Sequence, residues 1–303
     1  MKANTRTFAM AALASAFATA AWAQEFGRVH FETSCTPQAQ EKFDRGLAMV
    51  HSFVYPDSVA AFAEAAAADP RCAIAYWGIA ISHRPNPLIL PLSAAVLKNG
   101  FEAVEKGKAI SAKTETERDW LAAIELYYKD YDKVDQTARG LAYAKAMERL
   151  IQKYPDDPEA AVFYALALNE TALPSDRTYA NQLKAGLEKV LVTHPNHPGA
   201  LHYLIHSYDY TPLAQRALAA ANKYAGIAPA AQHAQHMPAH TYSMLGLWAQ
   251  SVESNTKSRE AAQEQAARLL AGGDPSGRAA PPGFHGIRTA ANWAGAAREA
   301  GPR

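Results

Sequence analysis

Histidines recur at a fixed spacing in the C-terminal half of the chain. His202 and His206 lie four residues apart, and a shift of 34 residues gives a second pair, His236 and His240. Residues four apart share one face of a helix, so each pair can direct both imidazoles the same way. Imidazole nitrogen binds Zn, Cu or Ni, and zinc takes three or four protein ligands. Two interpretations follow: a Zn or Cu site, or a groove of hydrogen-bonding imidazoles that holds a peptide.

Two further residues are candidates for the same group. His233 lies seven residues before His240 and can share the face of the helix on which the pairs lie. Asp209 follows His206 by three residues and is the best candidate for a carboxylate ligand. The alternative for Asp209 is a solvent-exposed residue at the end of a helix.

Pro238 stands between two of the histidines and affects how they can be arranged. Proline lacks the N–H of a helical hydrogen bond and disfavours helix at the residue before it. Either the helix is kinked between His236 and His240, or it begins at Pro238. In the second case, His233 and His236 lie in the loop that approaches the helix.

The spacing of His202 and His206 is also that of the two zinc ligands in a zinc-protease helix. Tyr203 stands where that motif has its glutamate, which acts as the general base. The chain therefore lacks the metalloprotease motif. It also lacks a phosphate-binding glycine loop and a nucleophile elbow, and the sequence predicts no particular reaction.

A helical repeat positions these residues. A 34-residue helix–turn–helix repeat has a small residue, a bulky one, a second small one and a proline at fixed spacing. Residues of these types stand at that spacing in this chain, at Gly46, Phe62, Ala65 and Pro70. Pro195 and Pro229 are 34 residues apart, and Pro155 precedes Pro195 by 40, which an insertion around LNETALPSD explains. Apolar helical patterns with aromatic residues follow Pro70, Pro155 and Pro195.

This pattern resembles the tetratricopeptide repeat (TPR) family over residues 39–270. The resemblance implies an all-α, TPR-like α-solenoid over residues 39–271, with about six helix-turn-helix repeats that begin near residues 39, 73, 117, 158, 198 and 232. The stretches HSFVYPDSVAAF, DPRCAIAYWGIA and HMPAHTYSMLGLW also resemble a group of exported bacterial TPR proteins of unknown function. Residues 272–303 depart from that pattern, and we interpret them as an irregular or truncated tail.

The resemblance also implies which residues line the concave groove of the solenoid. The histidine pairs match groove positions, and Leu47, Trp77 and Val162 hold the same phase in other repeats. Tyr242, near the histidines, is a further candidate for partner contact. The groove is therefore expected to be apolar at one end, where an extended peptide, a partner protein or the chain's own residues 24–38 would cover it.

The N-terminus has the features of a secretory signal peptide over residues 1–23. Lys2 and Arg6 precede an apolar stretch, and Ala21-Trp22-Ala23 forms a small-x-small cleavage site. Removal of these residues leaves a secreted protein, periplasmic in our interpretation, with no integral membrane segment. In an oxidising compartment, Cys35 and Cys72 are expected to form a disulfide, with two buried free thiols as the alternative.

Composition excludes some classes of partner. The chain has 303 residues, of which 49% are hydrophobic and 19% charged, enough to bury a sizeable core. After signal cleavage, 28 basic and 29 acidic residues remain, without a basic run. This balance argues against binding to nucleic acid. The sequence favours an exported TPR scaffold that binds a protein or peptide in its groove, with a metal-binding protein or metalloenzyme as the alternative.

Overall fold

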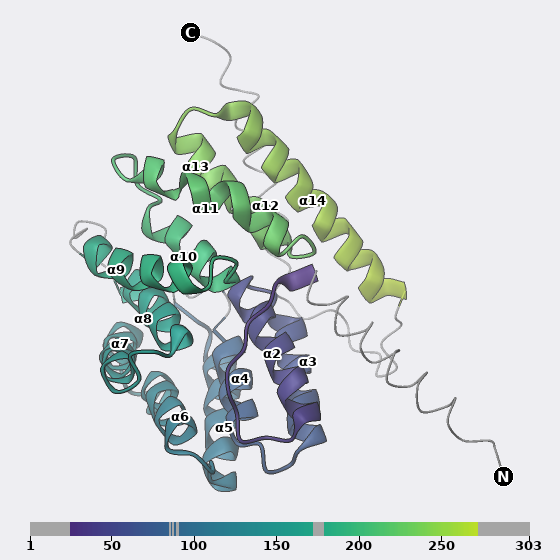
Figure 1. Cartoon of the computed structure of the whole chain (residues 1–303). Helices are drawn as coiled ribbons and strands as arrows, with labels where there is room; N and C mark the ends of the chain where they lie inside the picture. The colour runs from purple at the N-terminus through teal and green to yellow at the C-terminus, as the bar shows by residue number, and fades with distance from the viewer. Residues whose placement is uncertain (1–24, 85, 87, 89–90, 172–178, 272–303) are drawn as a thin grey trace, which may run out of the picture.

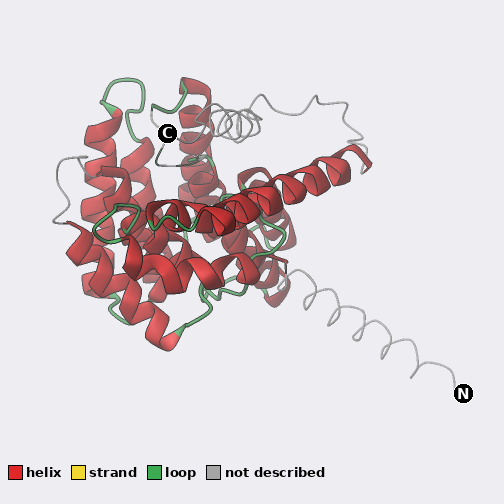
Figure 2. Cartoon of the chain, turned by 90° about the horizontal axis from the view of Figure 1, so that it is seen from above, coloured by secondary structure: helices red, strands yellow, loops and turns green. Residues whose placement is uncertain are grey.

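The computed structural model describes residues 25–84, 86, 88, 91–171 and 179–271. The predicted signal peptide (1–23) and tail (272–303) lie outside the described residues. Within that part of the chain, the regular structure is helical and contains no strand (Figure 2). None of the helices there is long and apolar enough to cross a membrane.

The described residues form six antiparallel helical hairpins (Figure 1). In chain order these are α2 (Pro37–His51) with α3 (Tyr55–Ala68), α4 (Ile74–Ser82) with α5 (Ala94–Ile110), α6 (Glu115–Tyr128) with α7 (Gln136–Lys153), α8 (Pro158–Thr171) with α9 (Tyr179–Thr193), α10 (Pro198–Ser207) with α11 (Ala214–Ile227), and α12 (Gln232–His236) and α13 (Pro238–Met244) with α14 (Trp248–Ala271). The first helices begin at most two residues from the predicted starts of the repeats. The prediction of an all-α, TPR-like solenoid is confirmed.

The small and bulky residues of the repeat fit together as the helices stack. Phe62 on α3 is fully buried, and its ring lies against two glycines, Gly46 on α2 and Gly78 on α4. A Cβ atom at Gly46 would lie 3.0 Å from the ring, and one at Gly78 would overlap it. The missing side chains let three helices approach one another around a single aromatic ring.

The array curls until its first hairpin touches its fifth. The end of α2 lies against α10, where the His51 imidazole packs on Tyr203 with ring centroids 5.8 Å apart. A Cβ atom at Gly199 would overlap the His51 ring, so glycine at the start of α10 makes this approach possible. The turn between α2 and α3 thereby reaches the helices that carry the paired histidines.

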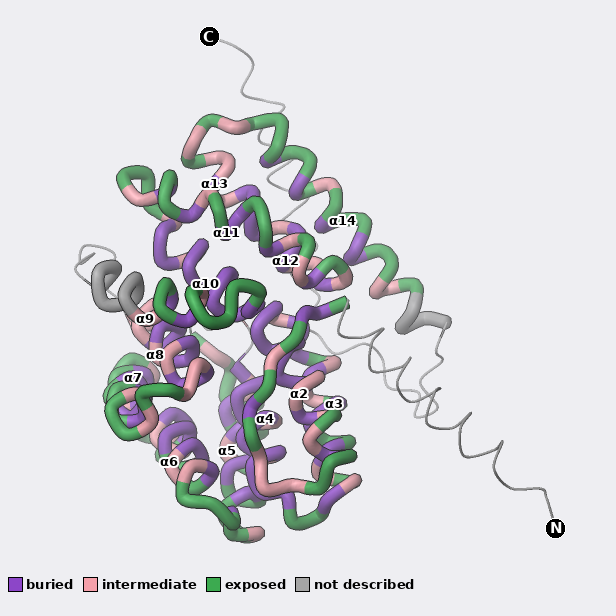
Figure 3. The backbone as a smooth tube through the Cα atoms, in the orientation of Figure 1, coloured by how far each residue is buried: buried purple, intermediate pink, exposed green. Residues whose placement is uncertain are grey.

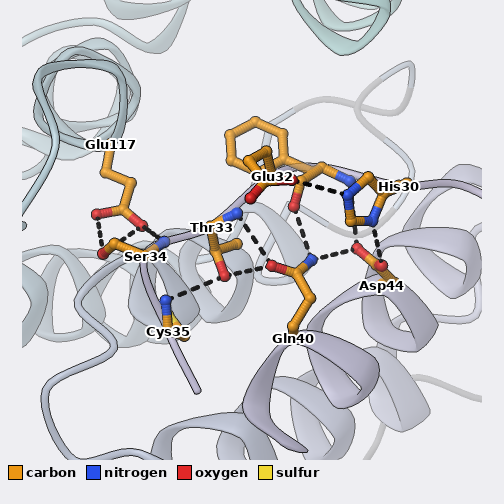
Figure 4. A network of polar contacts seen from close by, with 9 residues as sticks. His30, Glu32, Thr33, Ser34, Cys35, Gln40, Asp44 and Glu117 are labelled. Atoms are coloured by element: carbon orange, nitrogen blue, oxygen red, sulfur yellow. Dashed lines mark hydrogen bonds and ion pairs between the residues drawn. The ribbon is translucent and has the colours of Figure 1, made fainter. Parts of the chain in front are cut away.

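The N-terminal segment, residues 25–36, begins with a helical turn at Glu25 and Phe26 and then runs in an extended path along the inner side of the array (Figure 1). At one end, the carbonyl of Glu25 accepts a hydrogen bond from the backbone N–H of Ala230, at 3.0 Å. At the other end, the N–H of Ser34 donates to Glu117 of α6 at 2.7 Å (Figure 4). The segment thus connects the fifth hairpin with the third.

Side chains of α2 hold the middle of this N-terminal segment. Gln40 accepts a hydrogen bond from the backbone N–H of Thr33 and donates one to the carbonyl of Phe31, at 2.9 and 2.8 Å (Figure 4). Asp44 accepts from the N–H of Phe31 at 3.2 Å. The backbone of the segment is therefore bound by complementary polar groups, while the side chains of Phe26 and Phe31 reach the core.

Phe31 fills the apolar end of the predicted groove. Its ring stacks on Trp77 at 6.0 Å and meets Trp120 edge-on at 5.2 Å. Much of α2 and α4 is buried (Figure 3). Leu47, Trp77 and Val162 have no exposed surface. Of the three occupants expected to cover this end of the groove, the structure has the chain's own N-terminal segment, which lies against Trp77 through Phe31.

The predicted pairing of the cysteines agrees with the structure. The Sγ atoms of Cys35 and Cys72 lie 2.01 Å apart and form a disulfide. The bond ties the end of the N-terminal segment to the turn before α4. Closing a loop of this length stabilises a fold by about 4 kcal/mol in the chain-entropy model.

Candidate metal centre

Five histidines from the fifth and sixth hairpins lie together on the inner side of the array. His202 and His206 are on α10, His233 and His236 on α12, and His240 on α13. Neighbouring rings have centroids 4.8–6.0 Å apart. We call these five residues the histidine cluster.

The break at Pro238 gives the cluster its shape. Helix α12 ends at His236 and α13 begins at Pro238, with Met237 between them in helical conformation. The helix is therefore kinked, and His233 and His236 lie on its short first part rather than in a loop. In this arrangement His233 lies next to α10, with its Nε2 atom 3.0 Å from that of His202.

Three of the five histidines converge on one point. The Nε2 atom of His202 lies 3.1 Å from that of His206 and 3.0 Å from that of His233. One nitrogen from each ring falls within a group of ligand atoms no more than 4.8 Å apart. Nitrogens that share a tetrahedral zinc ion at 2.0–2.1 Å are separated by about 3.3 Å, close to these distances.

The backbone of the first hairpin fixes the tautomer of His202. Its Nδ1–H donates a hydrogen bond of 2.6 Å to the carbonyl of His51, which leaves Nε2 with only a lone pair. One lone pair in the ring plane accepts one donor well, yet His206 and His233 both direct Nε2 at it. A cation bound among the three nitrogens satisfies an arrangement that hydrogen bonds alone do not.

The surroundings of these three rings favour neutral imidazole, the form that binds metals. Burial lowers the pKa of His202, His206 and His233 well below 6.5. The positive charge of neighbouring imidazoles, when protonated, lowers each pKa further. Each ring therefore keeps its lone pairs at neutral pH.

Phe53 and Tyr224 enclose this part of the cluster. The Phe53 ring meets His202 at 4.5 Å and stacks on His233 at 4.8 Å. The Tyr224 ring stacks on the other side of His202 at 5.2 Å. Phe53 has a φ of +57°, a conformation that is unfavourable for a bulky side chain and is found more often at functional sites.

The other two histidines form a separate pair. The Nε2 atoms of His236 and His240 lie 3.0 Å apart. The Nδ1 atom of His240 bonds to Asp209 at 2.6 Å, and that of His236 bonds to Asn255 at 2.7 Å. Asp209 thus orients a histidine, and its second oxygen, Oδ1, is buried without a hydrogen-bond partner.

The sequence grouped these residues differently. It paired His202 and His206 with His236 and His240, and gave His233 and Asp209 supporting roles. In the structure, His233 joins His202 and His206, while the remaining two histidines form the second pair. Tyr242 lies outside the cluster, and its hydroxyl donates to Asn222 of α11 at 2.9 Å.

A second buried group, not predicted from the sequence, consists of His51, Glu159 and His197. The Glu159 carboxylate accepts hydrogen bonds from His51 Nε2 at 2.8 Å and His197 Nε2 at 3.0 Å. These residues are at most 5% exposed. They come from three different hairpins and carry no shared spacing, so the sequence has no signal that could group them.

This buried triad is complete without a metal. The Nδ1 atom of His51 accepts from the Tyr203 hydroxyl, and that of His197 accepts from the N–H of Ala200, each at 3.2 Å. Every imidazole nitrogen therefore has a partner, and both carboxylate oxygens are satisfied. We interpret the triad as a structural support, which holds the end of α2 so that the His51 carbonyl meets His202.

We expect a Gly199→Ala substitution to disturb this support. The new methyl group would overlap the His51 imidazole, which Glu159 holds in place, and overpacking of this kind costs roughly 1–3 kcal/mol. Urea denaturation measures the loss. Gly226→Ala on α11 is the control, because no atom lies within 4 Å of its Cβ position. Equal stabilities of the two variants would contradict the close packing of α2 on α10.

Comparisons with known proteins find a remote structural similarity. No family model matches the chain, and no curated protein matches it significantly. One similar solved structure is YrrB, described as a TPR protein with an unusual peptide-binding site. The match has 15% identity and a TM-score of 0.33, and it covers 65% of this chain and 90% of YrrB. The histidine cluster therefore has to be interpreted from its own geometry.

Proposed function

We propose that this helical-repeat protein binds a transition metal ion through the Nε2 atoms of His202, His206 and His233. The observation that carries the proposal is the convergence of three Nε2 atoms, with that of His202 held free of a proton. Three imidazoles suit Zn or Cu, and one coordination position stays open for water or another ligand.

The contrast between the two buried clusters supports this choice. In the His51–Glu159–His197 triad, every ring nitrogen has a hydrogen-bond partner of the right kind. At His202, the Nε2 atoms of two imidazoles, His206 and His233, compete for a single lone pair. A metal ion would complete the arrangement around His202, whereas hydrogen bonds already complete the triad.

Titration of tag-free protein with Co(II) tests the proposal. We expect ligand-field absorption that saturates, and a thermal midpoint that rises with Co(II) because the ion binds the folded state. The His202→Gln/His233→Gln variant should lose at least 100-fold in affinity for this site.

The matched control is His83→Gln/His194→Gln, which removes two histidines that are not partners of the cluster. It should keep the affinity of the wild type. Unchanged Co(II) binding in the His202→Gln/His233→Gln variant would falsify the proposed ligands, provided that circular dichroism shows both variants to be folded.

A second candidate function is peptide binding on the inner side of the array. It is supported by the N-terminal segment, which lies there in extended form with its backbone bonded to Gln40, Asp44 and Glu117. A peptide partner would have to take the place of residues 25–36. We therefore rank metal binding first.

We also propose that the protein is exported to an oxidising compartment such as the periplasm. The signal-like sequence of residues 1–23 and the Cys35–Cys72 disulfide support this proposal. Labelling of the free thiols in protein extracted from each compartment, without reductant, tests the location and the oxidation state together.

A further inference from the structure

His236 and His240 face each other in a way that the proposed site does not explain. Their Nε2 atoms are 3.0 Å apart, which is hydrogen-bond distance. A hydrogen bond needs one donor and one acceptor. The partners of the two Nδ1 atoms therefore decide whether either ring has a proton to donate.

Both Nδ1 atoms point at oxygens that accept hydrogen bonds. His240 Nδ1 lies 2.6 Å from a carboxylate oxygen of Asp209, and His236 Nδ1 lies 2.7 Å from Asn255 Oδ1. The amide nitrogen of Asn255 donates to the carbonyl of Ser251 at 3.0 Å, which fixes the side-chain oxygen toward His236. Each neutral ring therefore carries its proton on Nδ1, and two lone pairs meet at the Nε2 atoms.

We propose that a second transition metal ion binds between His236 and His240, so that the cluster holds two ions. The inference deepens the proposed function and rests on it. Hydrogen bonding of a ligating histidine to a carboxylate or an amide oxygen through its other nitrogen is the usual support of a metal site. Asp209 and Asn255 supply that support for the second ion. At the first ion, the carbonyl of His51 supports the ligand His202 in the same way.

The two ions differ in their access to solvent. His202 is fully buried beneath Phe53 and Tyr224, whereas the side chain of His240 is 30% exposed and that of Asp209 is 23% exposed. Two protein ligands leave at least two positions of the second ion for water or an exogenous ligand. His206 and His233 are half-buried, so full burial of His202 is the difference between the two sites, and we expect the second ion to exchange faster than the first.

The two sites lie next to each other within one cluster. The rings of His206 and His240 have centroids 5.9 Å apart, and those of His233 and His236 are 6.0 Å apart. A ligand that occupies the open position of the second ion therefore lies near the first. This arrangement suits a small ligand with donor atoms for both metals.

Stoichiometry with Co(II) as the probe tests the inference. Tag-free wild-type protein should bind two equivalents, and the His236→Gln/His240→Gln variant should bind one. A brief exposure to EDTA should remove one ion quickly and the other slowly, and the fast phase should be missing in the variant. The His83→Gln/His194→Gln protein serves as the control and should bind two equivalents.

The outcomes separate this inference from the proposed function. One equivalent in both the wild type and the His236→Gln/His240→Gln variant would overturn the second site and leave the first. No binding by the wild type would overturn both. Two equivalents in the variant would also refute the assigned ligands of the second ion. Thermal unfolding of each protein confirms that the comparison is between folded chains.

Discussion

A Glu159→Ala variant is expected to lose about 2–6 kcal/mol of unfolding free energy, because it leaves two buried imidazole N–H groups without their acceptor. Glu159 is 1% exposed, and its two oxygens accept hydrogen bonds from His51 and His197. Removal of the carboxylate leaves two buried N–H donors without an acceptor, and each such donor costs about 1–3 kcal/mol. Urea denaturation followed by circular dichroism measures the change.

The same substitution should also weaken metal binding. His51 presents its carbonyl to His202, and loss of an interaction that orients a ligand reduces metal affinity about 10–100-fold. Glu41→Ala, at an exposed position on α2, is the control and should change stability by no more than about 0.5 kcal/mol. A Glu159→Ala protein as stable as this control would show that the triad contributes nothing to the fold.

The charge of Glu159 gives a further signature in the dependence of stability on pH. Burial raises the pKa of this carboxyl group, but attraction to His51 and His197 and their hydrogen bonds outweigh burial and lower the pKa below 4.5. The unfolded chain therefore takes up this proton at a higher pH than the folded chain does. The stability from Glu159 is complete above about pH 4.5 and is lost as the pH falls below it. A Glu159→Gln variant should show a shallower loss over that range.

The register of the repeat could be predicted from the sequence because it depends on local spacing. Prolines precede the second, fourth, fifth and sixth hairpins, and a shift of one repeat carries His202 and His206 onto His236 and His240. Equivalent positions of neighbouring hairpins can therefore be identified from their spacing in the sequence. This spacing puts four histidines at matching positions of neighbouring hairpins, and in the structure their rings lie in one cluster with that of His233.

The grouping of the ligands could not be predicted, since it depends on small rotations that accumulate over many helices. The curl of the array brings Phe53 and the carbonyl of His51 to His202, about 150 residues later in the chain. The kink before Pro238 turns His233 toward α10. A strict repeat would make the two histidine pairs equivalent, and these two departures make them different.

Phe31→Ala is expected to destabilise the protein by roughly 3–5 kcal/mol, the usual cost of truncating a buried phenylalanine. The ring is 4% exposed and packs against Phe43, Trp77 and Trp120. Its loss opens a cavity beside both tryptophans, so their fluorescence should shift to the red as water enters. Arg28→Ala, at an exposed position in the same segment, should leave stability and fluorescence unchanged.

This comparison also bears on which function the inner side of the array serves. A large loss for Phe31→Ala means that residues 25–36 are part of the core, and that a peptide could bind there only by displacing them. If Phe31→Ala were instead as stable as Arg28→Ala, the segment would contribute little and could leave its place at small cost. The apolar face around Trp77 would then be free for an extended peptide. Peptide binding would in that case rank beside metal binding as a function of the scaffold.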